Sequence, residues 1–387
     1  MSKKIKYIAF YSDSKDTLQN RQAALAAVQK INYISDTLAN SGYKVNIISP
    51  AWTDNKKGFY CGYSKRISNN IELTLFHTFS SGFKYIRMFK YIYSLMQLFF
   101  YLLFHVRKRE QVLVYHSIAL ILPVQVAKFI KGFTLILEVE EIYQDLQYVN
   151  PIMKRLEYHL IHKADKLIFA SKELNKKFNK DKKPAVTIYG AYTVQKDRKV
   201  SFLDNKIHVV YSGTLDPRKG GALAAIYAAK YLPDNYHVHI LGFGSPEEIK
   251  DLTNRIEKIN KTATAALTYE GIVYGEAYNQ FLQKCQIGLS TYKSHEDFCN
   301  TSFPSKILTY LSNGLQVVAG QIQSIEDAPM GKLLHYYEQQ TPQAIAEAIV
   351  SVDISRDYDS RSLVKELDIL FKNDLNRLLK MKDTRKN

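Results

Sequence analysis

The sequence predicts an α/β protein with two Rossmann-like, doubly wound domains, and three observations support this. Short β-branched and aromatic runs alternate with amphipathic helical segments, which is the strand–helix–strand order of a parallel sheet. This order pauses at the polar segment 195–206 and then starts again. The chain has 387 residues, 46% of them apolar, which is more than one hydrophobic core usually needs.

The first half of the chain predicts strands and helices in alternation. Gly42 follows the first helix as a C-cap, and Pro50 ends the second strand. Residues 51–80 show few clear periods, so we expect a long loop with short strands there. The expected strands are residues 5–11, 44–48, 112–115, 134–139, 166–170 and 186–188. The expected helices are residues 18–40, 123–131, 156–163 and 172–178, in addition to the segment 84–109 discussed below.

The second half repeats the pattern. The expected strands are residues 207–211, 237–241, 266–269, 287–291 and 316–319. The expected helices are residues 221–231, 246–259, 278–284, 306–312 and 344–352. Residues 362–381 form one more amphipathic helix, whose apolar side carries Leu363, Leu367, Leu370, Phe371 and Leu375.

Composition limits the range of partners. Lys and Arg total 53 against 37 Asp and Glu, a net charge of +16, which favours polyanions, anionic lipids or phosphorylated small molecules, although ordinary solubility is the alternative. No aromatic–basic recognition module is present, so no nucleic-acid partner is expected. The cysteines, Cys61, Cys285 and Cys299, form no CxxC pair and predict neither a zinc site nor a disulfide framework. A cytoplasmic location is expected, and the N-terminus is interpreted as a strand and not as a signal peptide.

Segment 84–109 is aromatic and apolar, with basic residues near both ends. Its uncharged stretch, 91–106, has 16 residues. A transmembrane helix needs about 17–25, so spanning is not expected. Two interpretations stay open: a helix lying on an anionic membrane surface, and a buried domain helix with basic ends.

Ligand sites in doubly wound sheets lie at the carboxyl ends of the strands. The loop "YSGTLDPRKGG" (211–221) follows a strand and opens a helix. Gly213 permits a tight turn, and Arg218 and Lys219 add positive charge at a helix start, where backbone N–H groups favour a phosphate. A surface loop with incidental basic residues is the alternative.

Two further loops have similar properties. In "LGFGSPEE" (241–248), Gly242 would let a ligand approach the backbone, although only part of a dinucleotide pattern is present. In the loop before residue 306, Ser305 and Lys306 lie at a helix start and would converge on an anion. Helix capping by Ser302 or Ser305 is the alternative and is compatible with anion binding. Together the loops predict a diphosphate held without a metal, since no Asp-x-Asp follows a predicted strand.

The order of these motifs resembles that of GT-B glycosyltransferases of the family-4 type, over most of the chain. The segments that carry the resemblance are "YSGTLDPRKGG", "ILGFG", "YEGIV" (269–273), "FPSKILTYLSNGLQVVAG" (303–320) and "HKADKLIFASKELNKKF" (162–178). Within that family the chain is similar to a subgroup with the "FPSK" sequence.

The resemblance implies two Rossmann-like domains facing a cleft. Residues 1–195 would bind the acceptor, 196–355 would bind the nucleotide sugar, and the C-terminal helix, 356–387, would pack back on the N-terminal domain. The implied activity is transfer of a hexose-type sugar, with retention, from a nucleotide diphosphate sugar to a glycan or lipid-linked glycan. It needs no cofactor or metal and fits cell-surface polysaccharide synthesis, on the inner face of the membrane or in the cytoplasm.

The resemblance also implies site residues. Lys219 and Lys306 would stabilise the leaving diphosphate, which is a catalytic role. The other implied donor-binding residues are Gly213, Thr214, Arg218, Gly242, Gly271, Ser302, Phe303 and Ser305. The chain departs from the family at Thr214, where an arginine is common, and at Thr301 and Thr309, which replace a glutamate pair. Glu296 or Asp297 could substitute for that pair.

The acceptor side has two candidate catalytic groups. His116 follows a predicted strand, and Glu138, Glu140 and Glu141 end the next one. A carboxylate there could orient the acceptor hydroxyl. The alternatives are a packed loop histidine and solvation of a helix start.

Three other functions remain open from the sequence. A nucleotide-sugar 2-epimerase shares the fold and needs no acceptor. A non-catalytic partner subunit would explain the missing glutamates. Nucleic-acid binding is indicated by net charge alone.

Overall fold

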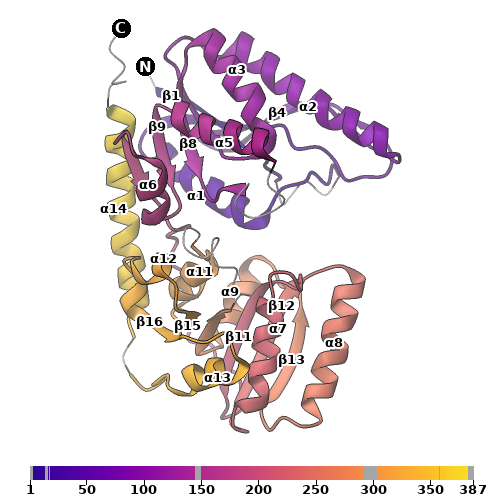
Figure 1. Ribbon diagram of the computed structural model, residues 1–387, viewed down its shortest axis with the longest axis vertical. Coiled ribbons are helices and arrows are strands. Elements are labelled where there is room, and N and C mark those ends of the chain that lie inside the picture. Colours follow the sequence, from indigo (N-terminus) through magenta and orange to yellow (C-terminus); the bar gives the residue numbers. More distant parts are fainter. Residues whose placement is uncertain are drawn as a thin grey trace. The chain divides into compact units, whose positions relative to one another are not determined.

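The computed structural model describes residues 3–13, 16, 18–143, 150–291, 303–356 and 358–381. The chain divides into two compact units. Figure 1 shows the helices and strands of both, coloured along the sequence. Unit 1 comprises Met1–Ala191 with Leu370–Asn387, and unit 2 comprises Tyr192–Ile369.

Unit 1 contains an eight-stranded sheet in the order β10-β9-β8-β7-β1-β2-β5-β4. Only the β4–β5 pair of this sheet is antiparallel among the described pairings. The order in which the strands are added to the sheet reverses between β1 and β7, which are parallel. The carboxyl ends of these two strands are therefore the topological switch point of the sheet. Its strands are β1 (Lys3–Ile8), β2 (Tyr43–Ser49), β4 (Tyr63–Ser68), β5 (Ile71–Leu75), β7 (Gln111–Tyr115), β8 (Thr134–Val139), β9 (Lys166–Phe169) and β10 (Ala185–Thr187).

Helices pack on this sheet because their apolar sides and the apolar side chains of the strands are buried against each other. They are α1 (Leu25–Asn40), α2 (Lys84–His105), α3 (Ile121–Lys131), α5 (Pro151–Lys163) and α6 (Lys172–Phe178), with a short 3₁₀ helix η1 (Ile118–Leu120) before α3. Gly132 ends α3 in the left-handed conformation, at φ 63°. The Asn150 side chain caps α5 by accepting from the backbone N–H groups of Ile152 and Met153.

Two expectations for unit 1 need correction. Residues 18–24 are not helical, because the Arg21 guanidinium donates to the backbone oxygens of Ala51 and Phe76 and holds this segment against them. Segment 51–80 is more ordered than expected. Besides β4 and β5 it forms the small pair β3 (Phe59–Tyr60) and β6 (Thr78–Phe79). β5 extends the main sheet because alternate residues of the strand are buried.

Unit 2 contains a six-stranded sheet in the order β13-β12-β11-β14-β15-β16, and all its pairs are parallel. In chain order this is 3-2-1-4-5-6, the Rossmann arrangement, with the switch point between β11 and β14. The strands are β11 (Ile207–Thr214), β12 (Tyr236–Phe243), β13 (Ala266–Gly271), β14 (Ile287–Ser290), β15 (Gln316–Gly320) and β16 (Leu334–Tyr337). The predicted α/β class with two doubly wound sheets is confirmed.

The helices of unit 2 lie close to their expected positions. They are α7 (Gly221–Ala228), η2 (Ala229–Tyr231), α8 (Pro246–Asn260), α9 (Gly275–Gln283), α11 (Lys306–Asn313), α12 (Gln323–Glu326), η3 (Gly331–Leu333) and α13 (Pro342–Val350). Ser245 and Glu248 form a capping box at the start of α8. β16 and α12 were not predicted.

The last helix, α14 (Ser360–Lys380), begins in unit 2 and ends in unit 1. At its start, the Ser360 hydroxyl donates to Leu311 O at 2.7 Å. Near its end, Leu379 O accepts from Gln111 Nε2 at 2.9 Å and from Lys166 Nζ at 3.2 Å. The expected return of the C-terminal helix to the N-terminal domain is therefore observed in these contacts.

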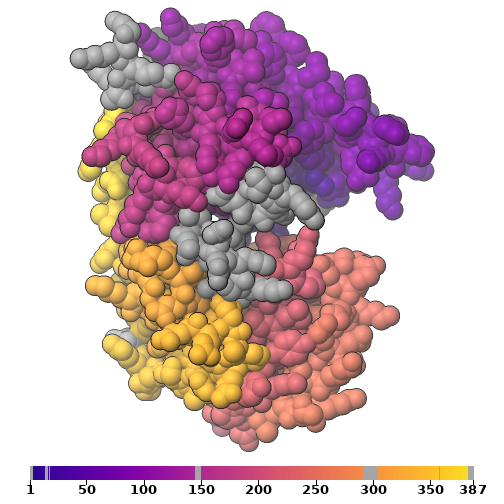
Figure 2. Space-filling view, viewed as in Figure 1, coloured from indigo at the N-terminus to yellow at the C-terminus, as the bar shows by residue number. Residues whose placement is uncertain are grey.

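Helix α2 is half buried. Lys90, Ser94, Leu98 and Leu102 face the core of unit 1, whereas the opposite side of the helix is exposed. α2 is one of the surface segments in the space-filling view (Figure 2). Within the described residues, no helix has the length and hydropathy required to cross a membrane.

Candidate functional site

The strongest candidate site lies in unit 2, at the switch point between β11 and β14. Lys306 is the first residue of α11, and its Nζ lies 3.9 Å from the centroid of the Tyr211 ring. A Cβ added to Gly213 would come within 3.1 Å of the same Nζ, so the amine lies against the strand end. A side chain at position 213 would crowd the Lys306 amine.

The electrostatics of Lys306 are unusual. Burial of the amine, together with the nearby positive charge of Lys219, lowers the pKa of Lys306 from 10.5 to about 7. Part of the Lys306 side chain remains accessible. Among the residues that the structure describes, no carboxylate forms an ion pair with this lysine. The two like charges near the end of β11 make this the candidate site for an anion.

Glycines bring the strand ends close together. A Cβ on Gly242 would lie 2.1 Å from Gly213 O, and a Cβ on Gly221 would lie 2.5 Å from Thr291 O. Neither position can accept a side chain without movement of the backbone. The two predicted glycine-rich loops after β11 and β12 thus meet at Gly213 and Gly242.

Two tyrosines that sequence reasoning missed, Tyr310 of α11 and Tyr278 of α9, join their helices to Ser212 of β11. Tyr310 OH accepts from Ser212 N at 2.8 Å, and Tyr278 OH lies 2.6 Å from Ser212 Oγ. A Cβ on Gly288 would come within 2.4 Å of the Tyr310 ring, so this glycine provides the space for the ring. The network fixes the start of α11, and with it the position of Lys306.

The loop after β11 carries three predicted residues. Thr214 is the last residue of β11. Arg218 has an 86% exposed side chain and pairs with Asp216, with Nη2 and Oδ2 2.7 Å apart. The guanidinium of Arg218 holds the pKa of Asp216 below its ordinary value. Lys219 lies two residues before the start of α7, and Gly220 between them is left-handed, at φ 65°.

The remaining predicted donor residues differ in their placement. Ser305 is the N-cap of α11, but its hydroxyl makes no capping hydrogen bond, so the alternative of helix capping by Ser305 is not observed. Phe303 is buried, and Gly271 ends β13 in the left-handed conformation, at φ 74°, with open space around it. Thr309 Oγ1 lies 3.4 Å from Ser305 O. Ser302, Thr301, Glu296 and Asp297 lie outside the described residues.

Unit 1 holds an acidic cluster at the end of β8. Lys30 of α1 forms an ion pair with Glu140 and lies 3.8 Å from Glu138 Oε1. Tyr7 OH donates to Glu138 Oε2. Burial raises the pKa of Glu138 from 4.5 to about 8, although the charge of Lys30 opposes this shift. The Glu138 side chain is fully buried, whereas 22% of the Glu140 side chain is exposed.

His116 follows β7 at the switch point of the first sheet, but it is completely buried. Its Nε2 lies 3.4 Å from Glu157 Oε1, and its backbone N–H donates to Glu138 O at 2.8 Å. Burial lowers the pKa of His116 to about 4, so the ring is neutral at physiological pH. Of the predicted acceptor-side residues, Glu140 and Glu141 therefore retain exposed area, whereas His116 and Glu138 lie below the surface.

Sequence reasoning missed Lys30, although a signal was present. Lys30 lies on the apolar side of α1 together with Ala27, Ile31 and Ile34, where a lysine is unexpected. A charged residue in such a position needs a buried partner, and Glu140 provides it.

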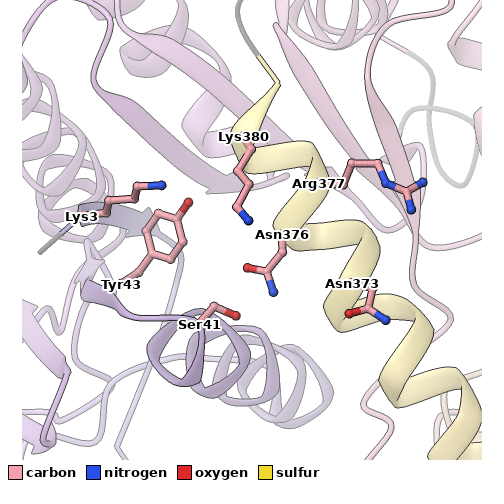
Figure 3. A pocket seen from close by; sticks show the side chains of 7 residues that line it. All are labelled: Lys3, Ser41, Tyr43, Asn373, Asn376, Arg377 and Lys380. Atoms are coloured by element: carbon pink, nitrogen blue, oxygen red, sulfur yellow. The ribbon is translucent and has the colours of Figure 1, made fainter.

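A polar hollow elsewhere in unit 1 contains none of the predicted site residues. It has a volume of about 460 Å³ and lies between the start of β1, the end of α1 and the last turns of α14 (Figure 3). Its lining residues are Lys3, Ser41, Tyr43, Asn373, Asn376, Arg377 and Lys380. The chemistry described above lies at the strand ends and not in this hollow.

Comparison with solved structures identifies the fold. The chain is similar to trehalose-6-phosphate synthase from E. coli bound with UDP-2-fluoro glucose, with a TM-score of 0.72 and 10% identity over 98% of this chain and 99% of that one. It is also similar to a UDP-forming α,α-trehalose-phosphate synthase from Burkholderia xenovorans (TM-score 0.67, 10% identity, 100% of both chains). HepE from Anabaena, in complex with UDP and glucose, matches with a TM-score of 0.65 and 13% identity over 98% of both chains.

These similarities place the chain in the GT-B fold class, which confirms the fold implied by the sequence motifs. No protein-family model matches the sequence, and no curated protein matches it. At 10–13% identity the solved structures establish the fold alone.

Proposed function

We propose that this protein is a glycosyltransferase that takes its sugar from a nucleotide diphosphate donor. The observation that carries the proposal is the position of the Lys306 amine, which lies against Gly213 and feels the charge of Lys219. A diphosphate bound there would relieve the repulsion between the two lysines. It would also accept hydrogen bonds from the free backbone N–H groups at the starts of α7 and α11.

The proposed reaction breaks the bond between the sugar C1 and the diphosphate oxygen. The diphosphate leaves with the bonding electrons, the acceptor oxygen forms the new bond to C1, and the proton of the acceptor hydroxyl passes to the leaving diphosphate. Lys219 and Lys306 would stabilise the charge that develops on the leaving diphosphate, without a metal. The resemblance to family-4-type enzymes with an "FPSK" sequence supports retention at C1, with Ser305 beside Lys306 at the phosphate.

The donor is proposed to be a uridine diphosphate hexose bound by unit 2. The structures similar to this chain include complexes with UDP-2-fluoro glucose and with UDP and glucose, which makes UDP the first nucleotide to test. Gly242 and Gly271 would allow the donor to approach the backbone. Phe303 and Thr214 would line the same site.

The acceptor is proposed to be a glycan, free or lipid-linked, bound by unit 1. Glu140 is the proposed contact for the acceptor hydroxyl, because it keeps exposed area and is held by Lys30. Glu138 and His116 would act as positioning residues behind it, since both are fully buried.

The donor proposal is tested by calorimetric titration of UDP and GDP into the wild type, Lys219→Ala and Lys306→Ala. Lys258→Ala is the matched control, because Lys258 is exposed on α8. Both site variants should bind UDP or GDP at least tenfold more weakly, whereas the control should not change. Equal affinities in all four proteins would refute the donor site.

Product analysis then separates the rival activities. Incubation with a UDP-hexose alone would give an epimerised or hydrolysed sugar if the protein is an epimerase. A transferase should give a new glycoside only when an acceptor glycan is present. Nucleotide binding without turnover across a panel of acceptors would favour the non-catalytic alternative.

We further propose that the protein binds an anionic membrane surface through α2 and α3, which would bring it to a lipid-linked acceptor. The two helices pack against each other, and their outer sides expose large apolar residues. We call this surface the α2–α3 face; it comprises Tyr85, Met88, Phe89, Ile92, Met96, Phe100, Phe104, Leu122, Val126, Phe129 and Ile130. Exposed basic residues flank it at Lys84, Arg87 and 107–109. Apolar side chains bordered by cations match a bilayer of anionic lipid.

Flotation with phosphatidylglycerol vesicles tests this part. The wild type should float at low salt, and less at high salt, whereas phosphatidylcholine vesicles should retain little protein. The double variant Phe100→Ser, Phe104→Ser should float less. Ile152→Ser, which changes an exposed apolar residue on α5, is the control. A wild type that stays unbound at low salt would show that the face does not dock on lipid.

A further inference from the structure

Three histidines cluster on one face of the unit 2 sheet. They are His208 on β11 and His237 and His239 on β12, and one ring nitrogen of each lies within 4.8 Å of the other two. His208 and His237 are register partners, and His239 follows two residues later, so all three side chains point to the same side. His208 precedes Gly213 by five residues on β11, roughly 16 Å along the strand, so the cluster is separate from the donor site.

Carboxylates fix the protonation pattern of two of the rings. His208 Nε2 lies 2.7 Å from Asp204 Oδ1, and His239 Nδ1 lies 2.8 Å from Glu270 Oε1. A carboxylate only accepts hydrogen bonds, so each of these nitrogens carries the proton of its ring. The other two nitrogens, His208 Nδ1 and His239 Nε2, are 2.9 Å apart and both present lone pairs. Two lone pairs at that distance repel each other unless a cation lies between them.

The third ring is held in the same way. His237 Nε2 lies 3.0 Å from Thr268 Oγ1, and the Thr268 hydroxyl in turn donates to Glu270. Each histidine thus has one nitrogen occupied by an outer partner. This is the arrangement in which metal-binding histidines are oriented in proteins, where a carboxylate or hydroxyl fixes the ring.

Aromatic rings enclose the cluster. Phe202 stacks on His208 with ring centroids 4.0 Å apart, and Phe281 of α9 meets His239 edge to face at 5.3 Å. His208 and His239 are almost fully buried, and His237 is partly exposed. A cation held here would be shielded on the side of Phe202 and reachable at His237.

We propose that His208, His237 and His239 form a binding site for a divalent transition metal, with Zn²⁺ as the first candidate. Imidazole nitrogens suit Zn²⁺, Ni²⁺ and Cu²⁺, and two nitrogens on one tetrahedral zinc are about 3.3 Å apart. The rings of His208 and His239 would therefore separate by only a few tenths of an ångström. The site lies at the far end of β11 from the lysines, so it would stabilise unit 2 and would not take part in sugar transfer.

The experiment uses the full chain without an affinity tag, treated with a chelator and titrated with Zn²⁺ by calorimetry. We expect one Zn²⁺ per chain and a higher melting temperature on binding. His239→Gln should weaken binding at least 100-fold. Asp204→Asn should weaken it by about 10- to 100-fold, because Asp204 orients His208 without being a ligand. Since Asp204 lies at the surface, the fold of this second variant should be unaffected.

His162→Gln is the matched control, because His162 pairs with Asp181 on the surface of unit 1 and should not affect binding. Co²⁺ provides an independent readout through its visible absorption bands, which should disappear in His239→Gln. Absence of stoichiometric Zn²⁺ binding would overturn the proposal. A proton shared between His208 Nδ1 and His239 Nε2 would then account for their short separation. Equal binding by the wild type and His239→Gln would overturn the proposal as well. Neither result depends on glycosyltransfer.

Discussion

The two units place different sets of charged side chains near the carboxyl ends of the strands in similar sheets. In unit 1, Glu138 and Glu140 lie around Lys30, and Tyr7 donates to Glu138, so the charges of the cluster are compensated within the protein. In unit 2, Lys306 has Lys219 as its charged neighbour, and the two repel. The comparison shows that a shared architecture does not fix the chemistry. The acidic cluster contains its own cation, whereas the lysine pair has no counter-ion in the part of the chain that the structure describes, and is therefore the better candidate for a ligand site.

The largest expected effect concerns the compensated cluster. Lys30→Met removes the cation that pairs with Glu140 and lies beside the fully buried Glu138 carboxyl, and should lower the free energy of unfolding by about 3–5 kcal/mol. Urea denaturation followed by circular dichroism measures the change. The double variant Lys30→Met, Glu138→Gln should recover part of the loss. If Lys30→Met proves as stable as the wild type, the cluster is not held by its ion pairs.

The second prediction concerns the uncompensated site. The proposed diphosphate needs the charged form of Lys306, whose pKa is about 7 in the free protein. As far as Lys306 decides it, UDP affinity should therefore be constant below pH 7. Above pH 7 the affinity should fall by up to about tenfold per pH unit, and UDP binding should be accompanied by uptake of a proton by Lys306. Calorimetry between pH 7 and 9 measures both quantities.

Lys306→Met supplies the reference for that experiment. It should bind UDP about 100-fold more weakly and show no proton uptake. A wild type whose UDP affinity is constant from pH 7 to 9 would contradict a direct contact between Lys306 and the diphosphate.

The third prediction compares the pH dependence of stability at the two sites. Glu138 has a folded pKa near 8, raised from 4.5, so its contribution to stability is complete below about pH 4.5 and is lost as the pH rises through 8. The lowered pKa of Lys306 acts in the opposite sense, and stability should rise between pH 7 and about 10.5.

Glu138→Gln should remove the first dependence, with a slope difference of up to about 1.4 kcal/mol per pH unit. Denaturation midpoints of the wild type and Glu138→Gln from pH 5 to 8 provide the measurement. Parallel curves for the two proteins would mean that Glu138 is ionised throughout this range.

The smallest effect is a gain in stability. Lys306→Met removes a half-buried amine that has no counter-ion among the described residues, so at pH 6 the variant should be more stable by about 1 kcal/mol. This corresponds to a rise of roughly 2–4 °C in the melting temperature of a unit the size of Tyr192–Ile369. Differential scanning calorimetry would detect it. A less stable variant would indicate that the contact between the Lys306 amine and the Tyr211 ring outweighs the cost of burying the amine.

The sequence predicted features that depend on local patterns. The strand 134–139 and the helix 172–178 were predicted with the bounds that are observed, because buried runs and flanking caps define them. The start of α11 at Lys306 and the loop around Gly213 were also predicted, since turns and helix starts have their own residue preferences.

Features that depend on distant partners were not predicted. Lys30 and Glu140 are separated by 110 positions, and no local pattern connects them. Arg21 interrupts a helical pattern because it binds backbone oxygens at Ala51 and Phe76. The histidine cluster had a local signal, His-x-His on a strand, but His208 joins it only through strand pairing.

The outer side of α2 and α3 also affects how the protein behaves once isolated. Aromatic and aliphatic groups such as Phe104 and Phe129, 75% and 89% exposed, will adsorb to plastic, resin and air–liquid boundaries. Preparations without a mild surfactant should therefore scatter light and lose material on concentration, even when every chain is correctly folded.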